Sequence, residues 1–202
     1  MAGLPPTDAF SRADLDIETV DAGQIIGRIH RRDYPDPLGF GKNASRFSDP
    51  RRRVSENRFG VLYLGSTLKV CFVEAILRDR RDGLVGDVVV DERELGDRLY
   101  SQICVQTPLR LVDLRGDNAM RMGIPSDVVR GRTQGLARKW SLAIYEHPTE
   151  IDGIIYPSRL NTETNFAIYD RGVGKLVPVA SGVLDVAPGI ADALDAFAVA
   201  LV

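Results

Sequence analysis

One acidic residue, Glu74, lies in the middle of a segment made mostly of apolar side chains. Residues 68–80, LKVCFVEAILRDR, have the spacing of a helix, and apolar residues cover nearly all of its surface. Such a helix is usually buried, and a buried carboxylate needs a cation, a ligand hydroxyl or a bound proton. Glu74 is therefore a candidate functional residue, although an ion pair with Arg78, four residues further on, would also account for it.

A long polar segment, residues 33–59, precedes this helix and carries several arginines. It contains Ser45-Arg46-Phe47, and further on Arg51, Arg52, Arg53 and Arg58. Guanidinium groups close to a buried acid could bind a phosphorylated ligand through its pyrophosphate. A solvated loop face is the alternative explanation for residues 51–53. A nucleic-acid patch is the third, and the lack of neighbouring aromatic residues for base stacking disfavours it.

A second polar group follows an apolar strand far downstream. The strand Ile151–Pro157 is followed directly by Ser158 and Arg159. Polar side chains at the end of a strand are placed where a cleft could use them. The alternative is a turn in which Ser158 and Asn161 bind only the local backbone.

The elements that would position these residues are strands separated by a few helices. Strands are predicted over residues 24–31, 59–65, 99–106, 109–114, 151–157, 166–170 and 175–179. Helices are predicted over residues 68–80, 132–146 and 189–202, with Ser66 or Thr67 capping the first. This order indicates an α+β fold with a central, largely antiparallel sheet flanked by helices. Residues 1–22 are predicted to be a lead-in with one short helix, and residues 23–202 a single domain.

Composition excludes several classes of protein. The chain has 202 residues, 44% hydrophobic and 27% charged, with a formal net charge of −2. These values are those of an ordinary globular domain, and they argue against a protein that coats DNA or an acidic membrane. No secretory signal and no membrane-spanning run is visible. Cys71 and Cys104 suggest neither a disulfide framework nor a zinc site, so we expect a reducing cytoplasm and no metal.

Common nucleotide and hydrolase motifs are absent from the sequence. No GxGxxG opens a helix after a strand, no GxxxxGK[ST] occurs, and no GxSxG is present. The sequence therefore lacks the usual support for a dinucleotide-binding Rossmann fold, a P-loop protein or a hydrolase with a nucleophile elbow.

Taken together, the short motifs resemble those of the RES-domain family. The resemblance rests on IIGRIHR in the first strand, a glycine-rich loop closing with SRF, VLYLGS leading into a helix with FVEA, and IIYPSR far downstream. It runs from about residue 25 to about residue 170, and the order and intervals of the motifs are more specific than any one of them. It implies a fold similar to that of ADP-ribosyltransferases and an activity that consumes NAD.

The resemblance also implies roles for individual residues. It assigns catalytic roles to Glu74, Arg28, Arg46 and Ser158. It implies contacts with NAD from Arg28, Arg31, Arg46, Tyr63, Thr133 and Ser158. Arg31 is the alternative to Arg28, because the register of the first strand is not determined by sequence. The paired-acid E-x-E turn of many ADP-ribosyltransferases is not evident.

The expected function is that of the toxin in a bacterial type II toxin–antitoxin system. The resemblance implies cleavage of the nicotinamide–ribose bond of NAD, transfer of ADP-ribose to a cellular protein, and an Xre-type antitoxin as the partner. Capture of ADP-ribose by water or phosphate, in an NAD glycohydrolase or phosphorylase, is the close alternative. A different class stays open: a non-catalytic module that binds a nucleotide or nucleic acid through the arginines of residues 46–58.

Overall fold

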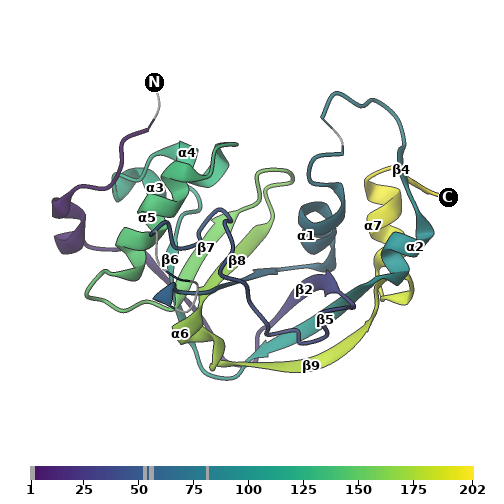
Figure 1. Cartoon of the computed structure of the whole chain (residues 1–202), viewed down its shortest axis with the longest axis horizontal. Coiled ribbons are helices and arrows are strands. Elements are labelled where there is room, and N and C mark those ends of the chain that lie inside the picture. The colour runs from purple at the N-terminus through teal and green to yellow at the C-terminus, as the bar shows by residue number, and fades with distance from the viewer. Residues whose placement is uncertain (1–2, 52–53, 55–56, 81) are drawn as a thin grey trace.

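A strongly curled sheet of eight strands forms the centre of the computed structural model, which describes residues 3–51, 54, 57–80 and 82–202 (Figure 1). The strand order is β1-β6-β7-β8-β3-β2-β5-β9. The strands are β1 (Ile17–Val20), β2 (Ile25–Arg31), β3 (Val61–Gly65), β5 (Arg98–Val105), β6 (Leu109–Asp113), β7 (Gly153–Pro157), β8 (Thr164–Tyr169) and β9 (Leu176–Val183). β6 pairs with β7 in parallel, whereas the other neighbours pair antiparallel.

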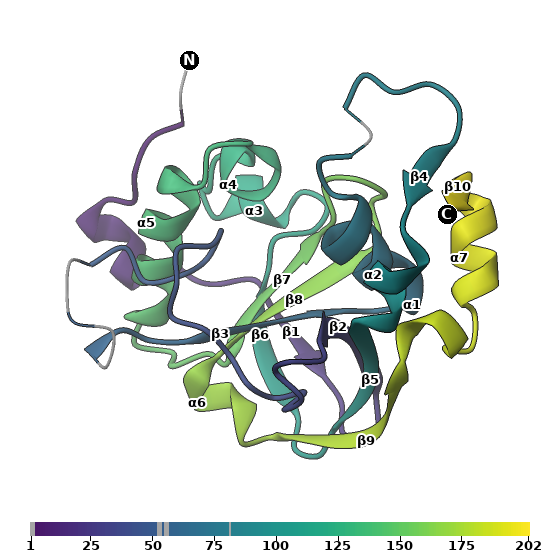
Figure 2. The ribbon, with the colours of Figure 1, turned by 45° about the vertical axis from the view of Figure 1, so that its right-hand side comes forward.

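The helices gather in two groups at opposite ends of this sheet (Figures 1 and 2). One group is α3 (Asn118–Arg121), α4 (Ser126–Arg130) and α5 (Gly135–Tyr145). The other is α1 (Leu68–Phe72), α2 (Glu92–Gly96) and α7 (Ile190–Ala196). The short elements are η1 (Asp8–Arg12), α6 (Asp170–Val173) and η4 (Leu184–Val186). The predicted α+β class, with a largely antiparallel sheet flanked by helices, is confirmed.

Three clusters of buried apolar side chains hold this arrangement together. Trp140 of α5 belongs to the first, Leu62 of β3 to the second, and Phe72 of α1 to the third. The two helix groups therefore pack in separate clusters, on either side of the middle strands β8 and β3. This separation leaves room between α1 and α5 for a cavity.

The predicted helix over residues 68–80 starts as expected but changes its geometry halfway. The Thr67 hydroxyl accepts a hydrogen bond from the Val70 backbone N–H at 3.1 Å, which caps the helix. At Gly65 a side chain would collide with Val70 and Cys71, so glycine lets β3 run close to α1. After Phe72 the chain widens into a π-helical turn, η3 (Val73–Leu77), which carries Glu74. Such turns frequently occur at functional sites.

The end of the chain differs from its prediction. The predicted helix over residues 189–202 ends at Ala196, where α7 stops, and Val199–Leu201 form strand β10. β10 pairs in parallel with β4 (Val88–Val90), and Ala198 between helix and strand has a positive φ of 46°. The alanine-rich composition favours a helix, but pairing with a strand more than a hundred residues away decides the structure.

Residues 1–22 contain a strand that the sequence did not predict. The expected short helix is present as η1, and β1 follows it at the edge of the large sheet. Ile17 of β1 lies opposite Val112 of β6. The Trp140 indole N–H also donates to the Leu4 carbonyl oxygen at 3.0 Å. This segment therefore contributes to the sheet and packs against α5.

Candidate active site

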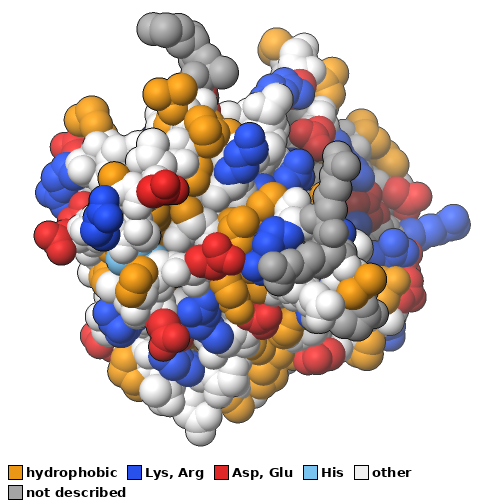
Figure 3. Space-filling view, turned by 60° about the vertical axis from the view of Figure 1, so that its left-hand side comes forward, with side chains coloured by type: hydrophobic (Ala, Val, Ile, Leu, Met, Phe, Trp, Pro, Cys, Tyr) orange, Lys and Arg blue, Asp and Glu red, His pale blue; other side chains and the backbone are white. Residues whose placement is uncertain are grey.

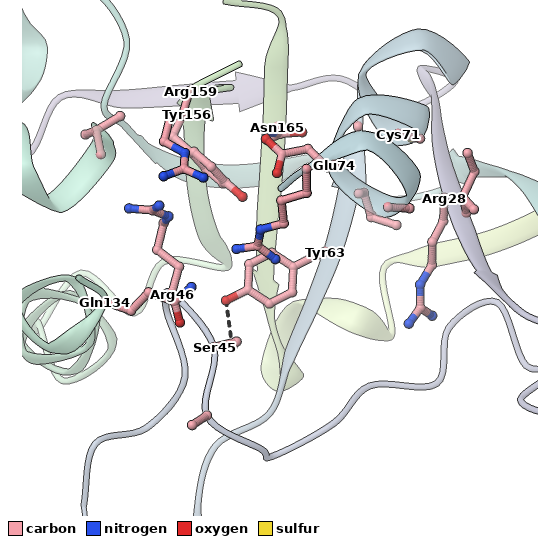
Figure 4. Close-up of a pocket in the computed structure, with 17 residues that line it drawn as sticks. Arg28, Ser45, Arg46, Tyr63, Cys71, Glu74, Gln134, Tyr156, Arg159 and Asn165 are labelled. Atoms are coloured by element: carbon pink, nitrogen blue, oxygen red, sulfur yellow. Dashed lines mark hydrogen bonds between the residues drawn. The ribbon is translucent and has the colours of Figure 1, made fainter. Parts of the chain in front are cut away.

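A cavity of about 300 Å³ lies between α1, the start of α5 and strands β3, β7 and β8. Its described lining contains one acidic side chain, Glu74. Four arginines also line it: Arg28, Arg46, Arg78 and Arg159. In Figure 4, Glu74, Arg46, Arg159 and the two tyrosines Tyr63 and Tyr156 gather around one space.

The Glu74 carboxylate is held by two neutral donors. Its Oε1 atom accepts a hydrogen bond from the Ser158 hydroxyl at 2.8 Å and another from the Asn165 amide Nδ2 at 3.0 Å. Among the described residues no ion pair includes Glu74, so the pairing with Arg78 that the sequence allowed is not formed. The carboxylate therefore keeps its charge available to the cavity.

Ser158 and Asn165 come from the hairpin that joins β7 to β8. Ser158 is 2% exposed, and its hydroxyl accepts from the Leu160 backbone N–H at 3.1 Å while donating to Glu74. Ser158 makes the local turn bond and also binds Glu74, but it does not itself line the cavity. Asn161 is purely local, since its Oδ1 accepts from the Glu163 N–H at 3.3 Å. Asn165 belongs to β8 and was missed as a site residue.

Arg46 reaches the cavity from the long segment before β3. The residue is 8% exposed, and its Nη1 donates to the Val128 carbonyl oxygen at 3.3 Å. Burial lowers the pKa of Arg46, and the positive charges of Arg159 and Arg78 lower it further. An anion stabilises positive charges that lie close together in a cavity. The end of the cavity that holds these guanidinium groups therefore suits a phosphate group.

Arg78 and Arg159 complete this positive end and were not among the predicted site residues. Arg159 lies 3.8 Å from the Asp79 carboxylate, which is exposed, and its guanidinium faces that of Arg46 in Figure 4. Arg78 is exposed at the end of η3, and its side chain forms no hydrogen bond or ion pair with another described residue. Arg159 could have been found from its place directly after Ser158 in the sequence. Arg78 could have been found from its spacing of four residues from Glu74.

Tyr63 lines the cavity as predicted, but its hydroxyl is already engaged. The hydroxyl hydrogen-bonds to Ser45 Oγ at 2.9 Å, as drawn in Figure 4, and accepts from the Phe47 backbone N–H at 2.8 Å. Burial raises the pKa of Tyr63. The hydroxyl is therefore engaged within the protein, which leaves the ring to line the cavity. Tyr156, on β7, is a second aromatic lining residue that the sequence did not single out.

Arg28 is at the margin of the cavity, and its guanidinium is bound elsewhere. Its Nη1 donates to the Pro37 and Gly39 carbonyl oxygens, both at 2.7 Å. Burial lowers the pKa of Arg28, and Asp36 nearby opposes this effect. Figure 4 shows the side chain pointing away from Glu74 and Arg46. In this structure Arg28 fastens the long polar segment to β2.

Two other predicted ligand residues, Arg31 and Thr133, do not line the cavity. Arg31 and Arg28 are three residues apart on β2 and thus point to opposite faces of the strand. Arg31 is exposed and pairs with Asp33 at 3.2 Å. Thr133 is exposed, although the next residue, Gln134, lines the cavity.

Arg51, further along the long segment, is paired with acidic side chains. Arg51 pairs with Asp49 at 2.6 Å and with Glu146 at 2.8 Å. Residues 52 and 53 lie outside the described residues. On the face seen in Figure 3, basic and acidic side chains are interspersed rather than gathered into a positive patch. The pairing of Arg51 and the mixed charge of this face give no support to a nucleic-acid surface among the described residues.

Within residues 3–51, 54, 57–80 and 82–202, no group of three or more His, Cys, Asp or Glu residues is placed to hold a metal ion. In the same part of the chain, no helix is both long enough and apolar enough to cross a bilayer.

The fold and the cavity define a class of protein: an α+β domain with a curled, largely antiparallel sheet and one carboxylate facing several guanidinium groups. The sequence profile of the RES domain matches residues 25–186. The chain belongs to the RES-domain family, and the resemblance noted in the sequence is confirmed.

Two individual proteins are similar to this chain. A protein of Sinorhizobium fredii named "Probable toxin y4kH" is 39% identical over 127 residues, which are 62% of this chain and 100% of that protein. A chain in the crystal structure of the M. tuberculosis MbcT-MbcA toxin-antitoxin complex superposes with a TM-score of 0.62. The match covers 89% of this chain and 91% of that chain at 16% identity, so it bears on the fold.

Proposed function

We propose that this chain is the toxin of a bacterial type II toxin–antitoxin system, that it cleaves the nicotinamide–ribose bond of NAD, and that it transfers ADP-ribose to a cellular protein. The observation that carries the proposal is the Glu74 carboxylate, which forms no ion pair with a described cation, in a cavity that also presents Arg46 and Arg159. The names of the relative in Sinorhizobium and of the tuberculosis complex support the toxin role. The family resemblance supports an Xre-type antitoxin as the partner.

Loss of nicotinamide is the step that Glu74 would accelerate. Breaking the N-glycosidic bond moves its electron pair onto nicotinamide and leaves positive charge on the ribose, in an oxocarbenium-like transition state. A carboxylate that accepts a hydrogen bond from a ribose hydroxyl becomes more favourable as this charge develops. Glu74 needs no proton transfer for this role.

The guanidinium groups would bind the pyrophosphate of NAD. Arg46 and Arg159 face each other at one end of the cavity, and Arg78 is free to join them. A dinucleotide is larger than a cavity of about 300 Å³, so part of NAD would lie across its mouth. The Tyr63 ring would pack against nicotinamide or ribose. Arg28 would act by fastening the segment that carries Arg46.

The acceptor of ADP-ribose distinguishes the main proposal from its alternative. In both, nicotinamide leaves first, and the ribosyl cation is then captured by a protein side chain or by water or phosphate. The alternative activity is that of an NAD glycohydrolase or phosphorylase. Both place the same demand on Glu74. The fate of the ADP-ribose group therefore has to separate them.

The test measures nicotinamide release from NAD by the purified chain. NAD labelled in its adenylate half is supplied with a cell lysate, and Glu74→Gln is run beside the parent chain. Glu92→Gln is the matched control, because Glu92 is exposed on α2 and the chemical change is the same. We expect release by the parent and the control, at least about a hundredfold less by Glu74→Gln, and label on a discrete protein band.

Other outcomes would assign other functions. Label found only in small molecules would replace the transferase with a glycohydrolase or phosphorylase. No release from a folded sample would reject the enzyme and favour the nucleotide-binding module. Turnover by Glu74→Gln at the parental rate would reject the proposed mechanism. We also expect expression of the chain to arrest growth, and co-expression of a helix-turn-helix protein encoded beside its gene to relieve the arrest. Failure of that relief would reject the antitoxin partner.

A further inference from the structure

The two oxygens of the Glu74 carboxylate have different surroundings. Oε1 accepts both described hydrogen bonds, from Ser158 and from Asn165, whereas Oε2 accepts none from any described residue. We propose that Ser158 and Asn165 are positioning residues, which hold one Glu74 oxygen so that the other is presented to the ribose of the substrate. This inference rests on the proposed function. The positioning role that it gives to Asn165 goes beyond that function.

The backbone around Asn165 is fixed on both sides. Asn165 lies between Tyr156 of β7 and Gly65 of β3 in the antiparallel ladder, and it is 4% exposed. The amide can place only its Nδ2 toward a carboxylate, because its oxygen would be repelled. A donor on a central strand is held more accurately than one on a loop. Asn165 therefore supplies a rigid reference point for Glu74.

Ser158 has no free donor for the contact with NAD that the family resemblance implied. Its one hydroxyl proton is donated to Glu74, and the same oxygen accepts from the Leu160 N–H. A hydroxyl has one proton to donate, so no donor is left for the ligand. Ser158 thus acts on the substrate through Glu74.

Neutral donors suit a carboxylate that must meet a cation. An arginine bound to Glu74 would neutralise the charge that the oxocarbenium-like transition state requires. Arg46, Arg78 and Arg159 line the same cavity, yet none forms an ion pair with Glu74. A serine hydroxyl and an amide orient the carboxylate and leave its negative charge in place.

The first arm of the test uses kinetics with NAD. Asn165→Ala removes one donor, and we expect kcat to fall about tenfold to a hundredfold while KM changes less than about threefold. Asn165→Asp has nearly the same shape but places a carboxylate beside Glu74, and we expect a larger fall at pH 8. Asn118→Asp is the matched control, since Asn118 lies at the start of α3 and does not line the cavity.

The pH profile gives a result that a general loss of structure would not. Below neutral pH the introduced carboxyl group, placed beside another acid, should bind a proton, which restores an O–H donor toward Glu74. The kcat of Asn165→Asp relative to the parent chain should therefore rise about tenfold or more from pH 8 to pH 5. The same ratio for Asn165→Ala should stay flat.

Other ionisable groups near Glu74 are common to the variants and the parent. They come from α1 and η3, the segment before β3, β3, β7 and the turn after it: Cys71, Arg78, Asp79, Arg46, Tyr63, Tyr156, Arg159 and Glu163. Because the substitution leaves these groups in place, the ratio of the variant's kcat to the parent's kcat isolates the effect of residue 165.

The second arm does not depend on activity. Crystal structures of the parent chain and of Asn165→Ala should show Glu74 in one orientation in the parent and rotated or split in the variant. If the carboxylate keeps its orientation in Asn165→Ala, or if kcat is unchanged, the inference is overturned. A flat pH ratio for Asn165→Asp would also overturn it. Absence of NAD cleavage by the parent chain, with Glu74 still rotated in the variant, would reject the proposed function and leave the positioning role intact.

Discussion

The Ser158 hydroxyl lies 2.8 Å from the Glu74 carboxylate, although the two residues are 84 positions apart in the chain. The contact joins a hairpin of the central sheet to the π turn after α1. It turns two separate sequence signals, an acid in an apolar helix and a serine at a strand end, into one structural unit. Asn165 extends this unit across β8.

Arg159 should contribute to ligand affinity. We expect Arg159→Gln, made in the inactive Glu74→Gln chain, to weaken NAD binding about tenfold, because one charge-assisted contact to the pyrophosphate is lost. Isothermal titration calorimetry measures the affinity. Arg93→Gln is the control, since Arg93 is exposed on α2. Equal affinities for the two variants would place the pyrophosphate elsewhere.

Arg28 should contribute to stability through the segment it fastens. Arg28→Gln loses the two bonds to the Pro37 and Gly39 carbonyls, and we expect the free energy of unfolding to fall by about 1–3 kcal/mol. Urea unfolding measures this change. Arg31→Gln, at an exposed position of the same strand, should stay within about 0.5 kcal/mol of the parent. Lost NAD affinity with unchanged stability would instead support direct contact between Arg28 and NAD.

Tyr63 should hold the segment around Ser45 in place. Tyr63→Phe leaves the Phe47 N–H and the Ser45 hydroxyl without this partner, and we expect a loss of about 1–3 kcal/mol of unfolding free energy. Tyr34→Phe removes the same atom from a side chain that is 70% exposed. Chemical denaturation of both variants tests the prediction, which fails if they are equally stable.

Stability should fall at alkaline pH in part because of Cys71. Burial raises the pKa of the Cys71 thiol from 9.0 to about 12 in the folded chain. Between these values the unfolded chain releases the proton and the folded chain keeps it, so rising pH favours unfolding. We expect the parent chain to lose up to about 1.4 kcal/mol per pH unit more than Cys71→Ala in this window. Urea titrations at pH 8 and pH 10.5 measure the difference, and parallel losses would contradict it.

Much of the fold was predictable from local patterns in the sequence. The strands that became β2, β3, β5 and β6 were predicted close to their observed limits, since alternation and turn residues act over short distances. The strand β1 and the terminal strand β10 were not predicted. Each depends on a partner strand that is distant in the chain, and four or three residues carry too little pattern of their own.

The sequence by itself singled out Glu74, Arg46 and Ser158, because an acid among apolar residues, arginines in a long polar segment and a polar group at a strand end are local anomalies. Tyr63 was named through the family resemblance. Tertiary structure alone decided which side chains meet. It joined Asn165 to Glu74, brought Arg159 to face Arg46, and turned Arg28 toward backbone carbonyls. The physical reason is that the type of a residue sets the free-energy cost of burying it, and this can be seen in the sequence. The partner that offsets this cost is determined by strand register and by the crossing of α1 over the sheet.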